Sequence, residues 1–476
     1  MIAEIVFEPQ KQLIPMIGIW LGCLGLFFWI QVKKDYEGAG FVFSYIVLLS
    51  LIHLFGAIIH AVPEFAMADS TYVALGFRES LWGLGAFCAG ALVPAFRRAA
   101  LERTGASRME IRLGKREILF LIAAGALFVG LDRVLGAIPS VGAAVRSGKT
   151  LLQVGILLGT WRAIVTGKKS QLFAWLLCLG CYPVIGLLGS GFLSYATMTL
   201  VISFSFLMIF YRPRWHVIAL ALPATYLVIS FFVAYMRERE EIREKVWKGA
   251  ALEQRLEKVD GIFKKFEWFD IRNEEHLSPI DGRLNQNVFL GKTVYRIEAG
   301  SLVPLQGQTL WWGVTSMIPR ILWPDKPMTA GSMGIMRYLI GEQLAEGTSF
   351  GLGQALEGYA NFRRTGVIGF LFLLGWLVAE LDLRCGQALR RGDWRTFSLY
   401  FLVTVPLICP EWSSIELFSG TAAAAMLAWG LRMTLLRDPG KGGAAPQIGS
   451  RDAGGTPMAE RPKRFVYGES RLRGKD

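Results

Sequence analysis

The sequence predicts an all-α polytopic membrane protein with about 11 transmembrane helices. The 476-residue chain is 53% hydrophobic and 12% aromatic, and its apolar residues fall in long runs. A membrane-spanning helix needs about 20 predominantly apolar residues, and runs of this kind recur along the chain. The predicted spans are 13–32, 41–62, 77–96, 117–138, 150–167, 171–188, 192–211, 216–235, 366–384, 396–411 and 415–434.

The distribution of basic residues predicts the orientation in the membrane. Lysine and arginine are concentrated in segments 33–40, 97–116, 168–170, 212–215 and 384–395. The alternate short loops hold only Arg146 and Lys149. Because positively charged loops stay in the cytoplasm, we expect a bacterial inner-membrane protein with a periplasmic N-terminus and a cytoplasmic C-terminus. Glu4 and Glu8 precede the first apolar run, which indicates a retained helix rather than a cleaved signal peptide.

Two polar segments divide the chain. We expect spans one to eight within 1–235, a large periplasmic loop over 236–365, spans nine to eleven within 366–436 and a disordered basic cytoplasmic tail over 437–476. Apolar residues at helical spacing from Arg237 to Lys265 indicate an amphipathic helix on the membrane. A solvated helix packed on its neighbours explains that pattern equally well. The rest of the loop is punctuated by glycine and proline, which suits short helices over the membrane surface.

The large loop also contains the candidate binding groups. Its cations are separated by aromatic residues and glycines: Arg283, Arg296, Arg320, Lys326 and Arg337. Guanidinium groups bind phosphate oxygens in pairs and stay charged in a partly dry site, so such a set suits a diphosphate. Solvated or headgroup-contacting charges are the alternative interpretation. The carboxylates that are candidates for a general base are Asp325, Glu342, Glu346 and Glu357.

Other chemistries are not expected. The histidines are His53, His60, His216 and His276, and none has a partner at metal-ligand spacing, so we expect no metal and no other cofactor. His53 and His60 share one face of a predicted span, where hydrogen bonds between helices are the simpler interpretation. Asp132 and Arg133 also fall in a predicted span, and an ion pair is the simpler explanation for them. The net charge of +13 follows the loops, so no nucleic-acid partner is expected.

One part of the loop resembles a known family. Residues 318–327 read Ile-Pro-Arg-Ile-Leu-Trp-Pro-Asp-Lys-Pro, and Thr348, Ser349 and the run Glu-Gly-Tyr-Ala-Asn-Phe at 357–362 follow. This pattern, with a large loop before the last helices, resembles Wzy-type polymerases of O-antigen and exopolysaccharide repeat units. The resemblance implies a GT-C-like polymerase or ligase architecture. It also implies metal-independent transfer of a glycan from undecaprenyl diphosphate to a lipid-linked repeat unit.

The resemblance implies roles for individual residues. Arg320 is expected to stabilise the leaving diphosphate, and Glu357 to act as the base or to position a sugar or an arginine. Supporting diphosphate or glycan contacts are expected from Arg283, Arg296, Lys326, Arg337, Tyr338 and Tyr359, with Trp311, Trp312 and Trp323 as further stacking groups or interfacial anchors. The expected partners are undecaprenyl-diphosphate-linked oligosaccharide, membrane lipid and a chain-length regulator protein.

The chain departs from the family pattern at two places. Relatives often have glycine directly after the Asn-Phe pair, whereas Arg363, Arg364 and Thr365 precede Gly366 here. Many relatives also carry an arginine in a short outer loop where this chain has residues 189–192, Gly-Ser-Gly-Phe. Arg133 or Arg146 is expected to replace that phosphate ligand.

Two alternative functions remain open from the sequence. An O-antigen ligase has a similar architecture and typically offers a histidine in its outer loop, for which His276 is the candidate. A secondary transporter or flippase of lipid-linked glycan would use Asp132, Arg133 and Glu380 as a charge pathway. Transporters place binding groups at the bilayer midplane beside broken helices in related halves, and this sequence shows neither repeats nor paired interruptions.

Overall fold

The structure of this chain is a computed structural model. It describes residues 9–33, 37–62, 69–101, 113–136, 138, 141–190, 193–210, 223, 226–227, 229–237, 266–319, 322–323, 325–326, 331–343, 351–434 and 436. These residues belong to the first of two compact units, residues 1–436. The predicted tail, most of the predicted amphipathic helix, Arg320, Thr348 and Ser349 lie outside the described residues.

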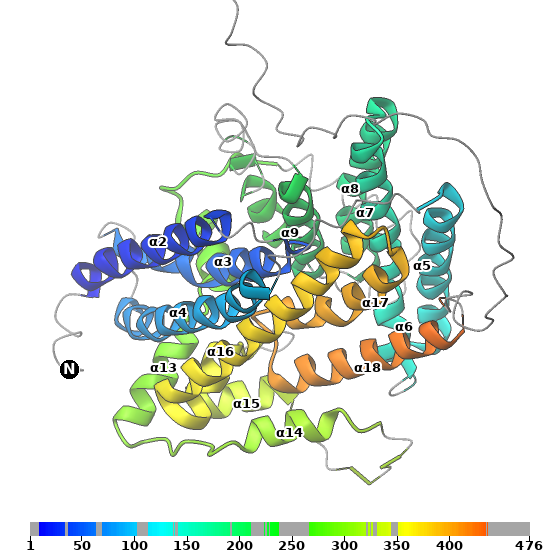
Figure 1. Ribbon diagram of the computed structural model, residues 1–476. Coiled ribbons are helices and arrows are strands. Elements are labelled where there is room, and N and C mark those ends of the chain that lie inside the picture. Colours follow the sequence, from blue (N-terminus) through cyan, green and yellow to red (C-terminus); the bar gives the residue numbers. More distant parts are fainter. Residues whose placement is uncertain are drawn as a thin grey trace, which may run out of the picture. The chain divides into compact units, whose positions relative to one another are not determined.

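The described residues form helices and contain no β-strand (Figure 1). The first group is α2 (Pro9–Lys33), α3 (Phe41–Ala61), α4 (Ser70–Leu101), α5 (Lys115–Leu135), α6 (Val141–Gly148), α7 (Thr150–Val165), α8 (Lys169–Ser190) and α9 (Leu193–Phe210). The second group is α12 (Glu274–Leu284), α13 (Asn287–Glu298), α14 (Gln308–Ser316), α15 (Gly331–Ile340), α16 (Gln354–Arg390), α17 (Trp394–Thr404), the 3₁₀-helix η2 (Val405–Ile408) and α18 (Ser414–Met433).

The chain is a multi-pass membrane protein. Among the described residues, six helices are long and apolar enough to cross a membrane: Lys11–Lys33, Phe41–Ala61, Ser70–Arg97, Lys115–Leu135, Gln354–Arg390 and Ser414–Met433. Every predicted span contains described helical residues, which within 216–235 are residues 223, 226–227 and 229–235. The all-helical prediction is therefore confirmed for the described residues.

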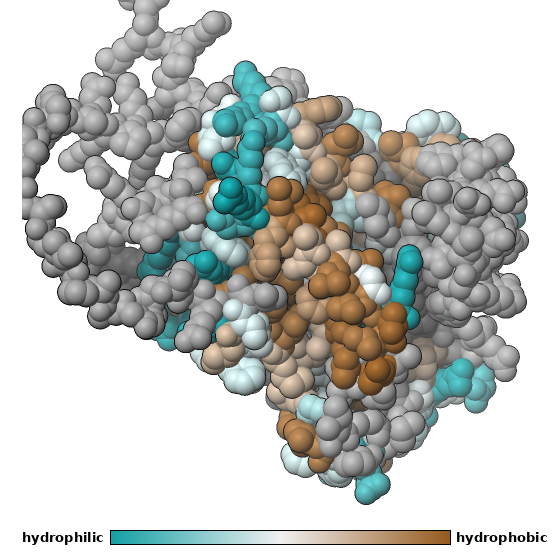
Figure 2. Space-filling view, turned by 90° about the vertical axis from the view of Figure 1, so that its right-hand side faces the viewer, coloured by the Kyte–Doolittle hydropathy of each residue, from teal (hydrophilic) through white to brown (hydrophobic). Residues whose placement is uncertain are grey.

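Large apolar side chains cover much of the outer surface of these helices. Ile14, Leu127, Leu177 and Trp429 each expose more than half of their surface. Figure 2 shows such hydrophobic residues gathered across one face, with hydrophilic residues toward its margins. An apolar area of this extent is unusual on a soluble monomer and is what contact with lipid requires.

The centre of the bundle is the packing of α4 against α16. Glycines on both helices allow the close approach. A Cβ atom at Gly90 would lie 2.0 Å from the carbonyl oxygen of Phe372, and one at Gly375 would lie 2.2 Å from that of Phe87. Small residues at such contacts allow dispersion attraction between backbones, which drives helix association in lipid.

Helices α12, α13 and α14 pack against one end of the bundle, and α15 packs on α13. We call this end the loop end. It is formed by the C-terminal half of α3 and the N-terminal turns of α4, α16 and α18. In Figure 1, α13 and α14 accordingly lie beside the first, yellow part of α16. A Cβ atom at Gly291 of α13 would lie 1.8 Å from the carbonyl oxygen of Tyr72 on α4. The loop helices are therefore packed directly on the spanning helices.

The opposite end is closed by a buried carboxylate. Asp382 of α16 accepts hydrogen bonds from the backbone N–H groups of Ala39, Phe41 and Val42, at 2.6, 3.2 and 3.2 Å. Phe41 and Val42 lie in the first turn of α3, where backbone N–H groups have no partner within the helix, and Ala39 lies just before it. A carboxylate also complements the positive end of the helix dipole.

Candidate functional site

A chain of polar side chains fixes the loop helices to α3 and α4. His53 Nδ1 lies 2.8 Å from Asn287 Oδ1 and 3.0 Å from the Ser80 hydroxyl. The Asn287 amide also donates to the His53 carbonyl at 2.7 Å. His60 Nε2 lies 3.1 Å from the Asp281 carboxylate of α12. The predicted role of both histidines in hydrogen bonds between helices is confirmed.

Glu357 lies in the first turn of α16, where α14, α16 and α18 meet. Its side chain is buried, and its carboxylate accepts hydrogen bonds from the Ser414 N–H at 2.6 Å and the Ser414 hydroxyl at 2.5 Å. Asn361, one turn later, donates to the Thr309 hydroxyl at 2.7 Å and accepts from the Gly307 N–H at 2.9 Å. Glu357 and Asn361 thus fasten the start of α16 to α14 and to the start of α18.

A second junction joins α4 to α16 through charges. Arg364 donates two hydrogen bonds to the fully buried Glu79 carboxylate, from Nε to Oε2 at 2.9 Å and from Nη2 to Oε1 at 2.7 Å. Arg78 donates to Glu79 at 2.8 Å and lies 3.6 Å from Glu298. The hydroxyl of Tyr359 donates to Glu298 at 3.0 Å, and its ring is buried. The predicted sugar-stacking residue Tyr359 therefore supports a charged junction inside the protein.

Glu411 lies in the turn between η2 and α18. Its carbonyl accepts a hydrogen bond from the Gly353 N–H at 3.0 Å, which holds the turn against the start of α16. Its half-buried carboxylate accepts from the Cys409 thiol at 3.8 Å and is hydrogen-bonded to Ser194. Burial raises the pKa of the Glu411 carboxyl above its ordinary value, and the hydrogen bond from Ser194 and, more weakly, the charge of Arg283 oppose that shift.

The structure places the predicted cations in different surroundings. Arg283, half-buried at the end of α12, is the predicted cation that interacts electrostatically with Glu411. Arg296 donates to the carbonyls of Tyr338 and Leu339 at 2.7 and 2.8 Å. Lys326 donates to the carbonyls of Ser316 and Ile318, both at 3.1 Å. Arg296 and Lys326 thus satisfy carbonyls at the C-terminal ends of α15 and α14.

Three further predicted residues are exposed. Arg337 and Tyr338 lie on the exposed face of α15, and Arg133 is exposed near the end of α5. Asp132 pairs with Lys149 rather than with Arg133, which confirms an ion pair as the explanation for this acid. Arg146 donates to the carbonyl of Gly136 at 2.9 Å and interacts electrostatically with Tyr195, as does Glu411.

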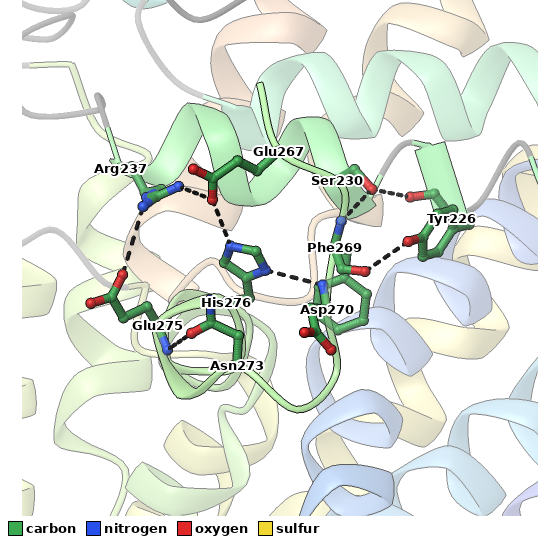
Figure 3. Close-up of polar contacts among 9 residues, drawn as sticks. All are labelled: Tyr226, Ser230, Arg237, Glu267, Phe269, Asp270, Asn273, Glu275 and His276. Atoms are coloured by element: carbon green, nitrogen blue, oxygen red, sulfur yellow. Dashed lines mark hydrogen bonds and ion pairs between the residues drawn. The ribbon is translucent and has the colours of Figure 1, made fainter. Parts of the chain in front are cut away.

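His276 of α12 is held from both sides of its ring (Figure 3). The N–H of Asp270 donates to His276 Nδ1 at 3.0 Å, so the proton of the neutral ring lies on Nε2. That nitrogen lies 3.4 Å from Glu267, which also binds Arg237 at 2.8 Å. Hydrogen bonds lower the pKa of the Glu267 carboxyl, the one from Arg237 more than the one from His276. The His276 side chain is buried and has a protein partner on each nitrogen.

Sequence reasoning missed Glu411, Glu79 and Arg364. Glu411 is the last residue of the predicted span 396–411, whereas the structure ends the helical segment at Ile408 and places Glu411 in the turn before α18. Glu79 follows Arg78 directly, but its partner Arg364 is 285 residues away in the sequence.

These features define a class of protein: a multi-pass helical membrane protein with its buried acids at the ends of the helices. The central stretches 80–96, 118–131, 365–379 and 417–431 contain no charged residue. No protein-family model matches the chain, and neither does any curated protein or solved structure.

Proposed function

We propose that this chain is a membrane glycosyltransferase that polymerises oligosaccharide repeat units linked to undecaprenyl diphosphate, into O-antigen or exopolysaccharide. In this proposal the chain crosses the bacterial inner membrane eleven times, with a periplasmic N-terminus, a cytoplasmic C-terminus and the loop end in the periplasm. The sequence motif at 318–327 and 357–362 supports the family assignment. The orientation rests on the distribution of lysine and arginine.

The observation that carries the proposal is the half-buried carboxylate of Glu411 at the loop end, which interacts electrostatically with Arg283. An acid whose pKa is raised by burial holds a proton more readily than a solvated one, which suits a general base. The half-buried guanidinium of Arg283 stays charged, which suits the developing charge of a leaving diphosphate. In the proposed orientation both groups lie on the periplasmic side, where we expect a lipid-linked substrate to present its sugar–phosphate bond.

The proposed reaction forms one glycosidic bond for each diphosphate released. The hydroxyl oxygen of the acceptor repeat unit attacks the anomeric carbon of the donor glycan. The bond from that carbon to the diphosphate oxygen breaks, and undecaprenyl diphosphate leaves with the bonding electron pair. The hydroxyl proton passes to Glu411, while Arg283 and Arg320 bind the leaving group.

Glu357 has a positioning role in this scheme. Both of its oxygens already accept hydrogen bonds from Ser414, and its side chain is only 1% exposed. A base must reach the substrate hydroxyl, and Glu411 is the more exposed of the two acids. Glu357 therefore acts through the placement of α18 and of the turn that contains Glu411.

The two alternative functions have less support. A ligase histidine must offer a ring nitrogen to its substrates, whereas both nitrogens of His276 have protein partners. A transporter pathway through Asp132, Arg133 and Glu380 would need charges near mid-span. Asp132 instead pairs with Lys149 near the end of α5, and Glu380 pairs with Arg97 and Arg384 at the opposite end of the bundle.

The proposal is tested in cells that lack the chromosomal copy of the gene and carry a variant. Arg320→Ala and Glu411→Gln are expected to abolish long glycan chains on gels, while single repeat units still accumulate and are attached to their acceptor. Glu342→Gln is the control, because this exposed loop carboxylate pairs only with Lys292 among the described residues. A loss of all attachment would identify a ligase, and unchanged chain lengths in both variants would refute the proposed site.

A further inference from the structure

Helix α16 contains a sharp bend at residues 362 and 363. Phe362 has φ −135° and ψ 27°, and Arg363 has φ 53° and ψ −148°, so neither residue is helical. Among the described residues, Arg363 and Gln306 are the non-glycine residues with positive φ. Residues with a Cβ atom rarely adopt the backbone conformation of Arg363, whereas glycine adopts it readily.

The bend is fixed on both sides. Before it, Asn361 donates to Thr309 and to the Glu357 carbonyl and accepts from Gly307. After it, Arg364 is held by its paired hydrogen bonds to Glu79. A strained residue persists only where its surroundings determine the conformation, and both flanks of Arg363 meet that condition.

Arg363 lies at the boundary of the apolar stretch of α16. No charged residue occurs between Thr365 and Ala379, so the hydrocarbon-spanning part of the helix begins directly after the two arginines. The Arg363 side chain is exposed, and it forms no hydrogen bond or ion pair with the residues that the structure describes. With the predicted span starting at residue 366, its guanidinium is expected at the level of the lipid phosphates.

The surrounding charges leave this guanidinium in excess. Arg78 and Arg364 are balanced by Glu79 and Glu298 in the adjacent junction. Arg363 adds one further positive charge at the same end of the helix. A strained, exposed cation beside a neutral network is suited to an external anion, and a guanidinium binds phosphate oxygens in pairs.

We infer that Arg363 binds the diphosphate of the polyprenyl-linked substrate at the membrane boundary. The identity of the ligand rests on the proposed function, whereas the strained backbone, the exposure and the position of Arg363 do not. The bend explains how neighbouring arginines can have different roles. Residue 363 leaves the helical conformation and its side chain is exposed for binding at the bilayer surface, while Arg364 keeps its contact with α4.

The test uses the full chain, purified and placed in phosphatidylcholine nanodiscs, with a fluorescent polyprenyl diphosphate as the probe. Arg363→Gly removes the guanidinium and also relieves the strain, so we expect an unchanged or higher unfolding temperature with binding weakened about tenfold. Arg363→Asn gives a second loss of charge but keeps a Cβ atom, so it retains the backbone strain. Gln306→Gly is the matched control, because it relieves the same kind of strain without removing a charge, and it should leave binding unchanged.

Two results would overturn the assignment. One is wild-type affinity for the probe in both Arg363 variants. The other is equal displacement of the probe by phosphatidylglycerol, which would show a general headgroup contact. Failure of the proposed function gives a different pattern: the Arg363 variants would bind the probe more weakly, yet the wild-type chain would elongate no glycan.

Discussion

The Glu357 carboxylate receives both the backbone N–H and the hydroxyl of Ser414, at 2.6 and 2.5 Å. This contact joins the first turn of α16 to the first turn of α18 across 57 residues of sequence. It pairs the buried N–H of the first residue of α18, next to the capping box that Ser413 and Glu416 form. The turn that contains Glu411 lies directly before that helix, so its position depends on the same contact.

Glu357→Ala is expected to lower the free energy of unfolding by about 3 kcal/mol, because it leaves buried donors of Ser414 unpaired. Glu357→Gln keeps one acceptor oxygen and should retain most of the stability and part of the activity. Unfolding by SDS titration measures the stability of both variants, and the length of the glycan chains measures their activity. Wild-type stability combined with complete loss of elongation in Glu357→Gln would instead indicate that Glu357 is the base.

Arg364→Ala is expected to destabilise the chain by about 3 kcal/mol, since Arg78 is then the remaining described cation for both Glu79 and Glu298. Glu79→Gln should partly restore stability in the Arg364→Ala background, because it removes the excess negative charge of this junction. A double-mutant cycle of unfolding free energies measures this coupling. Additive effects of the two substitutions would contradict the proposed pairing.

His276→Ala is expected to shorten the lifetime of the folded chain without abolishing glycan transfer. The substitution removes the acceptor for the Asp270 N–H, which costs about 1–2 kcal/mol, but it removes no group that is exposed to substrate. Gel profiles and thermal unfolding of the same preparation check the two effects separately. A stable His276→Gln variant that transfers no glycan would favour the ligase alternative.

On acidification, the wild-type chain is expected to lose half of its activity at a higher pH than it would if the base were a glutamate with an ordinary pKa. The base must be ionised, and burial raises the pKa of Glu411. The same shift has a stability consequence. The folded state holds this proton to a higher pH than the unfolded state, so the contribution of Glu411 to stability declines as pH rises from the unfolded pKa through the raised folded pKa.

Glu411→Gln removes that titration. The difference in stability between the variant and the wild type should therefore shift in favour of the variant as the pH rises from acidic to neutral. Unfolding temperatures of both chains across that range check the sign. Parallel curves would show that Glu411 titrates normally.

Much of the bundle was predictable from apolar runs, because lipid contact imposes a long uninterrupted apolar segment. The ends of the helices were not. Helix α16 begins at Gln354, although its apolar run begins only at Gly366, because protein contacts of Glu357, Tyr359 and Asn361 bury its first turns. Hydropathy detects burial in lipid but not burial of polar residues under neighbouring helices.

The candidate site was predictable in part. The loop cations were identified as a set, yet Arg296 and Lys326 serve helix ends, and only the fold distinguishes them from Arg283. The strain at Arg363 likewise depends on backbone angles that no local pattern reports. The departure from the Asn-Phe-Gly pattern was visible, but its consequence required the bend in α16.

The most direct test of the account is reconstitution of the purified chain in liposomes with a synthetic oligosaccharide repeat unit linked to undecaprenyl diphosphate. Mass spectrometry of the products should show glycans of two or more repeat units and one released undecaprenyl diphosphate for each bond formed, with both signals absent in Glu411→Gln. Unchanged single repeat units and no released diphosphate from a folded wild-type chain that binds the lipid would contradict it.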